Sequence, residues 1–344
     1  MSIKIYKCAT NVMGNFTVSS HYTGKREEYY QDKISSSDAR AIASGDYYDL
    51  EKIWEQKINL SKDDLSNVFP VQLGLATEKF HTWWLNKELT RNNVVGYGHE
   101  HKLMNEQAHC VVESDSPAHP FILASTIDIA YTQEPIDSKL LNVLNQNIFL
   151  VELKHTGEYS NLDKVIENYY PQLQHHMYVW DTQEIMISAI FGNKRQQHDI
   201  VKRDDKFLAD YMKRAMELGE LIHDYWHAPE QFYQDGENST RDEWWNVSQE
   251  LDWVTGIPIE KDIVCASGKV YNLNECADWN WAKEFIDKAI GTSVSNTGFS
   301  KSKEENEHNK THLKKLIPDD AKSVTYNGIT ASRNKNGIVS IRIK

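Results

Sequence analysis

Residues 147–155 read Asn-Ile-Phe-Leu-Val-Glu-Leu-Lys-His, an apolar run that ends in charged side chains. A short apolar run of this kind is typical of a buried strand. Because side chains two residues apart on a strand point to the same face, Glu152 and Lys154 lie together. Burying a charged pair costs free energy unless a partner or a metal ion satisfies it. The run therefore predicts a central strand that ends at a chemical site.

On both sides of this strand, the sequence alternates between helical and strand-like patterns. Upstream, an apolar strand that begins at Phe121 carries Asp128 near its end, and Glu78 sits in the first turns of a helix. The predicted elements are a helix at 73–90, two or three strands within 94–131, a strand at 147–154, a helix at 162–180, a strand at 184–191 and a closing helix at 204–226. This order predicts an α/β core with a central mixed sheet flanked by helices.

Composition divides the chain into four predicted parts. Residues 291–311 are rich in Ser, Asn, Lys and Glu, as flexible linkers are. Further on, Asn327-Gly328 and Asn336-Gly337 are typical hairpin turns. The predicted domains are a core at 1–226, a Trp-rich appended helical and loop region at 227–290, a flexible linker at 291–312 and a small β tail at 313–344, the last two forming a C-terminal extension.

The bulk composition limits the class of protein. No apolar run is long enough for a membrane span and the first residues lack the apolar core of a signal peptide, so we expect a cytoplasmic protein without membrane contact. The four cysteines form no Cys-x-x-Cys pair or close group, so we expect neither a disulfide framework nor an iron–sulfur cluster. The net charge of −12 argues against whole-surface binding of nucleic acid and leaves local basic patches open.

The charged strand ends predict phosphodiester chemistry. Hydrolysis requires an activated water and positive charge for the developing oxyanion, and a divalent cation held by carboxylates supplies both. Asp128 and Glu152 are the predicted ligands, with the backbone carbonyl of Leu153 as a further one. Hard oxygen ligands favour Mg²⁺, with Mn²⁺ as a substitute. Lys154 is then placed to orient the water or to offset phosphate charge.

Each of these patterns has a simpler reading. Acidic-x-Lys triplets also occur at 55–57, 137–139 and 204–206, so the motif alone leaves a structural ion pair open. His99, His101 and His109 suggest either a transition-metal site or the solvated face of a strand. The Trp-rich region suggests either stacking on single-stranded bases or core packing. The basic residues of the last thirty or so positions suggest either contact with a nucleic-acid backbone or a solvated surface.

Four motifs in order make the chain resemble a known family. They are Gly74-Leu-Ala-Thr-Glu78, Ser125-Thr-Ile-Asp128, Glu152-Leu-Lys154 and Tyr169-Tyr-Pro-Gln172-Leu-Gln174-His-His-Met177. They resemble the motifs of the phage λ exonuclease and YqaJ-type viral recombinase family of the PD-(D/E)xK nuclease superfamily. The likeness covers about residues 28 to 225, including Ile34-Ser-Ser-Ser37 and the segment 200–207. It implies a restriction-endonuclease-like (PD-(D/E)xK) core.

The resemblance also implies roles for individual residues. Asp128 and Glu152 would bind the metal and Lys154 would assist the water, while Glu78 and Gln174 would complete the catalytic site. The residues that would contact DNA are Ser37, Ser125, Tyr170 and Gln172. Two departures stand out: the segment 125–128 lacks the family's Pro, and Tyr30 occupies the place of an Arg that grips a terminal phosphate, for which Lys25 or Arg26 would have to substitute.

The expected function is that of a Mg²⁺-dependent DNA exonuclease acting on double-strand ends in phage-type recombination. The resemblance implies DNA as substrate, a single-strand annealing protein as partner, a homo-oligomer as the assembly and a bacterial host's cytoplasm as the setting. An endonuclease of defence or DNA processing is the alternative enzyme. A catalytically silent DNA-binding or assembly protein is the alternative from another class.

Overall fold

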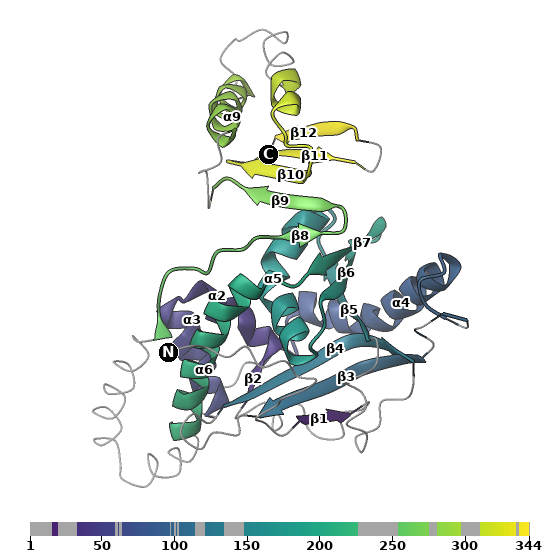
Figure 1. Ribbon diagram of the computed structural model, residues 1–344, viewed down its shortest axis with the longest axis vertical. Coiled ribbons are helices and arrows are strands. Elements are labelled where there is room, and N and C mark those ends of the chain that lie inside the picture. The colour runs from purple at the N-terminus through teal and green to yellow at the C-terminus, as the bar shows by residue number, and fades with distance from the viewer. Residues whose placement is uncertain are drawn as a thin grey trace. The chain divides into compact units, whose positions relative to one another are not determined.

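The computed structural model divides the chain into two compact units, Met1–Lys261 and Asp262–Lys344 (Figure 1). The described residues are 16–19, 33–58, 61, 64–96, 98–99, 101, 103–113, 121–133, 148–225, 254–274, 281–296, 310–334 and 337–343. None of the helices in these ranges is both long enough and apolar enough to span a membrane.

The first unit is built on a mixed sheet with the strand order β1-β3-β4-β5-β6-β7. The strands are β1 (Phe16–Ser19), β2 (Ile34–Ser35), β3 (Leu103–Glu113), β4 (Ile122–Thr132), β5 (Phe149–Thr156), β6 (Glu184–Phe191) and β7 (Arg195–Lys202). Neighbours on this path are antiparallel except β5 and β6, which are parallel, and the short β2 pairs parallel with β4. The prediction of a central mixed sheet is confirmed.

Helices pack on both faces of β5. The helices of this unit are the short 3₁₀ turn η1 (Ser36–Asp38), α2 (Ala39–Ser44), α3 (Tyr47–Lys57), α4 (Phe69–Arg91), α5 (Leu162–Val179) and α6 (Asp205–Tyr225). Leu85 of α4 belongs to the same buried cluster as Val151 and Leu153. The alternate residue Glu152 contacts Gln172 of α5. Since successive strand side chains point to opposite faces, α4 and α5 lie on opposite sides of β5 (Figure 1).

The predicted order of helix, three strands, helix and strand is confirmed by α4, β3 to β5, α5 and β6. Local signals explain the helix ends: Asp46 accepts hydrogen bonds from the Tyr48 and Asp49 amides before α3, and Asn161 accepts one from the Lys164 amide before α5. The pattern did not predict β7. Its sequence Arg-Gln-Gln-His-Asp-Ile-Val-Lys is mostly polar, and pairing with β6 rather than apolar alternation makes it a strand.

The second unit contains β8 (Val264–Cys265), β9 (Gly268–Asn272), α9 (Ala282–Asn296), β10 (Ala321–Tyr326), β11 (Ile329–Arg333) and β12 (Val339–Ile343). β9 and β10 are parallel, and the other pairs are antiparallel. The predicted turn between β10 and β11 is present, with Asn327 and Gly328 both at positive φ (43° and 78°). Phe285 of α9 shares a buried cluster with Val324 and Ile329.

This shared cluster bears on the predicted domain boundaries. α9 begins in the predicted Trp-rich region, continues to Asn296 within the range predicted as a linker, and packs against the strands predicted as a separate β tail. Trp281 packs edge-on against Tyr271 and Phe285, which favours core packing for this tryptophan. Trp244, Trp245, Trp253 and Trp279 lie outside the described residues. The boundaries at 226, 290 and 312 stay predictions.

Candidate active site

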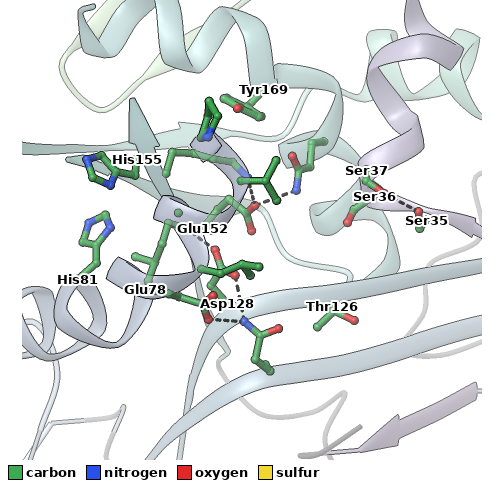
Figure 2. Close-up of a pocket in the computed structure, with 18 of the residues that line it drawn as sticks. Ser35, Ser36, Ser37, Glu78, His81, Thr126, Asp128, Glu152, His155 and Tyr169 are labelled. Carbon is green, nitrogen blue, oxygen red and sulfur yellow. Dashed lines mark hydrogen bonds and ion pairs between the residues drawn. The ribbon is translucent and has the colours of Figure 1, made fainter. Parts of the chain in front are cut away.

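A cavity of about 700 Å³ opens where β4 and β5 meet α4 and α5. Its lining is mostly polar and includes Glu78, Asp128, Glu152, Leu153 and Lys154. The carboxylates of Glu78, Asp128 and Glu152 come together around one part of this cavity, with Ser36 and Ser37 at another (Figure 2). Residues from all four sequence motifs thus line one cavity.

The cavity exists because two paired strands separate. β4 and β5 pair only through Ile129 to Tyr131 and Phe149 to Val151. Asp128 and Glu152 occupy the next position along each strand, beyond the last pair. There the Leu153 amide donates a hydrogen bond to Asp128 Oδ2 at 2.7 Å. A side-chain carboxylate therefore takes the place that a backbone carbonyl has in a continuous ladder, and the strands part beyond it.

Glu152 is held from three sides. Its Oε1 accepts hydrogen bonds from Lys154 Nζ at 2.6 Å and from Gln172 Nε2 at 2.8 Å. Its Oε2 is buried without a hydrogen bond, although His176 Nε2 lies 3.3 Å away at ion-pair distance. Lys154 Nζ also lies 4.4 Å from the centroid of the Tyr169 ring, a cation–π contact. Glu152 is thus fixed in place by contacts to both of its oxygens.

The two acidic residues differ in protonation. Burial raises the pKa of Asp128 from its ordinary value of 3.8 to about 8, and the negative charge of Glu152 adds to the rise. Burial also acts to raise the pKa of Glu152, but Lys154 and His176 outweigh it and lower this pKa to about 2. Burial acts to lower the pKa of Lys154, but the two carboxylates raise it overall. At neutral pH the site without a cation therefore contains an ionised Glu152, a charged Lys154 and a protonated Asp128.

Gln107 of β3 connects the carboxylates of Glu78 and Asp128, and it was not predicted from the sequence. Its Nε2 donates to Glu78 Oε1 at 2.6 Å and to Asp128 Oδ1 at 3.2 Å. Its backbone has a φ of 50°, which is rare for a residue other than glycine and is typical of functional sites. The antiparallel register of β3 and β4 places it opposite Asp128. Only that register, which the sequence does not reveal, identifies it.

The structure places the two glutamines of α5 differently from the resemblance. Gln172 lines the cavity and contacts Glu152. Gln174, predicted as catalytic, is fully buried: its Nε2 donates to the Lys202 carbonyl and its Oε1 accepts from the Asp204 amide, each at 2.9 Å. Two residues along a helix turn the side chain by about 200°, so the two amides point to opposite sides. Gln174 ties α5 to the connection between β7 and α6.

Of the predicted DNA-binding residues, some line the cavity and others are buried away from it. Ser37 lines the cavity, and its Oγ lies 2.8 Å from Ser35 Oγ. Ser125 is buried, with its Oγ between His176 Nδ1 at 2.7 Å and Trp180 Nε1 at 2.9 Å, so it supports the ring that flanks Glu152. Tyr170 is buried and donates to Asp204 at 3.0 Å. Tyr30, Lys25 and Arg26 lie outside the described residues.

The alternative histidine site receives no support from the geometry. His109 Nδ1 lies 2.8 Å from Thr126 Oγ1, and burial lowers its pKa to about 4. The His101 ring stacks against Phe149. Within the described ranges, no three or more His, Cys, Asp or Glu side chains are grouped so that they could hold a metal ion among themselves.

The donor set nevertheless fits a hard divalent cation. Mg²⁺ keeps several waters and takes one or two carboxylates from a protein, so it does not require three protein side chains. Asp128 and Glu152 supply two carboxylates at one wall of the cavity, and Glu78 brings a third near them through Gln107. The buried Glu152 Oε2 has no hydrogen bond of good geometry, and His176 Nε2 lies 3.3 Å from it. A cation would offset the burial and the negative charge of Glu152, which together raise the pKa of Asp128.

Comparison with known proteins gives partial likenesses. No family model and no curated protein matches the chain. The crystal structure of SSO0001 is 11% identical, with a TM-score of 0.34, and the match covers 57% of this chain and 79% of that chain. LHK-Exo, an alkaline exonuclease from Laribacter hongkongensis, is 12% identical, with a TM-score of 0.37 and coverage of 60% and 95%. Its complex with dAMP is 11% identical, with a TM-score of 0.36 and coverage of 60% and 94%. The basis for a function is therefore the chemistry of the site itself.

Proposed function

We propose that this protein is a metal-dependent deoxyribonuclease that hydrolyses DNA phosphodiester bonds. The observation that carries the proposal is the convergence of Asp128, Glu152 and Lys154 on one polar cavity at the point where β4 and β5 separate. Two carboxylates and an ammonium group match what phosphodiester hydrolysis needs: a place for a cation and positive charge beside the attacked phosphate.

Asp128 and Glu152 would hold Mg²⁺, or Mn²⁺ as a substitute, with the carbonyl of Leu153 as a further ligand. The cation, when bound, supplies positive charge for the developing oxyanion and makes a water more acidic. Lys154, which is positioned by Glu152 and Tyr169, orients the attacking water or offsets the charge of the phosphate. Gln172 fixes the rotamer of Glu152, and Gln107 holds Glu78 beside Asp128.

The finer assignment is a restriction-endonuclease-like core of the λ exonuclease type, acting on double-strand ends. Support comes from the order α4, β3, β4, β5, α5 and β6, and from the place of the four sequence motifs on these elements. A strand end would enter the polar cavity, which Ser36 and Ser37 line away from the carboxylates. An annealing protein as partner, a homo-oligomeric assembly and a role in phage-type recombination follow from the resemblance alone.

The function is tested by incubating the protein with linear and with closed-circular duplex DNA, in Mg²⁺ and in EDTA. We expect linear DNA to be degraded only with Mg²⁺ and circles to stay intact. Cutting of circles would replace the exonuclease by an endonuclease. If neither substrate is cut with Mg²⁺ or Mn²⁺, the nuclease proposal fails and a silent DNA-binding protein is favoured.

The affinity for Mg²⁺ should depend on pH with a defined sign. The cation binds the ionised carboxylate, and Asp128 must lose a proton with a pKa of about 8. The dissociation constant should therefore fall about tenfold per pH unit up to about pH 8 and level off above it. Titration calorimetry between pH 6 and 9 measures this. A constant affinity over that range would contradict the proposed role of Asp128.

The two glutamines of α5 provide a matched pair of variants. Gln174→Ala removes the hydrogen bonds that Gln174 makes with the Lys202 carbonyl and the Asp204 amide, so we expect a loss of stability of about 1–3 kcal/mol with little change in the cleavage rate of the folded protein. Gln172→Ala should instead lower the cleavage rate about tenfold or more, because Glu152 loses a positioning contact. Thermal melting and cleavage rates of both variants measure these effects. A lower cleavage rate in Gln174→Ala than in Gln172→Ala would support the predicted catalytic role of Gln174.

A further inference from the structure

Helix α4 presents two faces. On the inner face, Leu85 and Leu89 pack into the buried cluster with β5, and towards the N-terminus Glu78 and His81 line the cavity. The outer face contains large apolar side chains that are exposed in the described part of the chain. We name this face the aromatic–basic row, and its members are Lys79, Phe80, Trp83, Trp84, Lys87 and Arg91.

The aromatic members form one continuous surface. Phe80 and Trp83 are each 55% exposed, and Trp84 is 37% exposed. Ring centroids lie 5.9 Å apart for Phe80 and Trp83, 6.3 Å for Phe80 and Trp84, and 6.1 Å for the two tryptophans. Three large rings left in water on one helix face are unusual for a protein surface and indicate a binding site.

Positive charge accompanies the rings. Lys87 Nζ lies 5.3 Å from the centroid of Trp83 and 5.7 Å from that of Trp84. Lys79 precedes Trp83 by four residues, Lys87 follows it by four, and Arg91 follows Lys87 by four. The Arg91 side chain is 73% exposed, with its Nη1 3.7 Å from Glu88 Oε1. In a chain of net charge −12, this local arrangement of bases and rings is complementary to a polyanion that also exposes flat apolar surfaces.

The row lies on a different face of α4 from the cavity. Glu78 lines the cavity, and at about 100° per residue the Trp83 side chain points about 140° away from it, about 7–8 Å further along the helix axis. A single strand that leaves the carboxylates would reach the row by passing around α4. A second copy of the chain fits less well, because a symmetric contact would bring the same basic side chains toward each other.

We propose that the aromatic–basic row binds single-stranded DNA, the unpaired strand of the substrate, by stacking bases on Trp83, Trp84 and Phe80 while Lys79, Lys87 and Arg91 contact phosphates. A single strand is favoured over a duplex because only unpaired bases offer their faces to aromatic rings. The proposal rests on the proposed nuclease function for the source of the strand, but the binding itself requires no metal and no cleavage.

The test measures binding in EDTA by the fluorescence anisotropy of a labelled oligothymidylate of about 20 nucleotides. The double variant Trp83→Ala/Trp84→Ala should bind at least about tenfold more weakly, and Trp83→Phe/Trp84→Phe should restore most of the affinity. Lys87→Gln should reduce the salt dependence of binding. Tyr48→Ala, which removes an aromatic ring that is 76% exposed on α3, is the matched control and should bind like wild type.

Three outcomes would overturn the proposal. They are unchanged affinity in the double alanine variant, an equal loss of affinity for a blunt duplex, and a wild-type dimer in light scattering that the variant converts to a monomer. The last would assign the row to a second copy of the chain. Should the double variant melt at a lower temperature, the single variants Trp83→Ala and Lys87→Gln provide the same comparison. Absence of Mg²⁺-dependent cleavage by wild type would refute the proposed function and leave this binding result intact.

Discussion

The Asp128→Asn variant should lose Mg²⁺-dependent cleavage by about 10³-fold or more and, without metal, should be more stable than wild type at alkaline pH. The loss of activity follows from removing a charged ligand of the proposed cation. The gain in stability follows from the raised pKa, since the fold prefers the protonated carboxyl and an uncharged amide has the same shape.

The sign of the stability effect can be stated for each pH range. Folding raises the pKa of Asp128 from 3.8 to about 8, so wild type loses stability as the pH rises through this window. The variant does not, and its advantage should be smallest near pH 4 and largest above pH 8. One unit of pKa corresponds to about 1.4 kcal/mol, so an advantage of at least that size is expected at pH 9.

Thermal melting in EDTA at pH 5 and pH 9, repeated with saturating Mg²⁺, measures both parts of this prediction. Mg²⁺ should stabilise wild type by mass action and should leave the variant unchanged. A variant that is less stable than wild type at pH 9 in EDTA would show that the fold does not raise the pKa of Asp128. A variant that keeps its Mg²⁺ response would show that the ligands lie elsewhere.

Lys154→Gln is expected to lower the cleavage rate by about 10²-fold or more, because the amide cannot supply positive charge beside the phosphate. It should also destabilise the fold, since Glu152 is only 3% exposed and would lose its cationic partner. Removing one member of a buried pair costs about 3–5 kcal/mol. The lysine is 18% exposed, which places the expected cost at the lower end of that range.

A double variant separates the two effects. Glu152→Gln/Lys154→Gln replaces the ion pair by two neutral amides, so stability should return toward wild type while activity stays absent. Denaturant unfolding and single-turnover cleavage on the two single variants and the double variant measure this. A double variant as unstable as Lys154→Gln would mean that the buried charge of Glu152 is not the cause, and a fully active Lys154→Gln would remove the lysine from the mechanism.

Much of the site was predictable because strand periodicity is simple. The two-residue spacing of Glu152 and Lys154 places both on one face, and Asp128 near the end of the preceding strand needed only an antiparallel pairing to meet them. The helix 73–90 was predicted from apolar residues at helical spacing, and it extends to 69–91 in the structure. The local sequence was sufficient to predict a site residue wherever the periodicity of a single helix or strand determines the direction of its side chain.

The rest depended on how elements are rotated and aligned. Gln172 and Gln174 are equivalent in composition, and only the rotation of α5 against the sheet decides which of them reaches Glu152. Gln107 acquires its role from the register of β3 and from a positive φ that no local preference of glutamine favours. The association of α9 with β10 and β11 joins segments on either side of a stretch with the composition of a linker.

The hydrogen bond between the Leu153 amide and Asp128 gives one group two duties. The carboxylate serves as the last rung of the β4–β5 ladder and as a wall of the cavity. A substitution that extended the pairing of β4 and β5 beyond Asp128 would stabilise the sheet and would also close the cavity. A stabilising substitution at this position would therefore be expected to impair the site. Substitutions intended to raise the thermal stability of the protein are better placed elsewhere in the sheet.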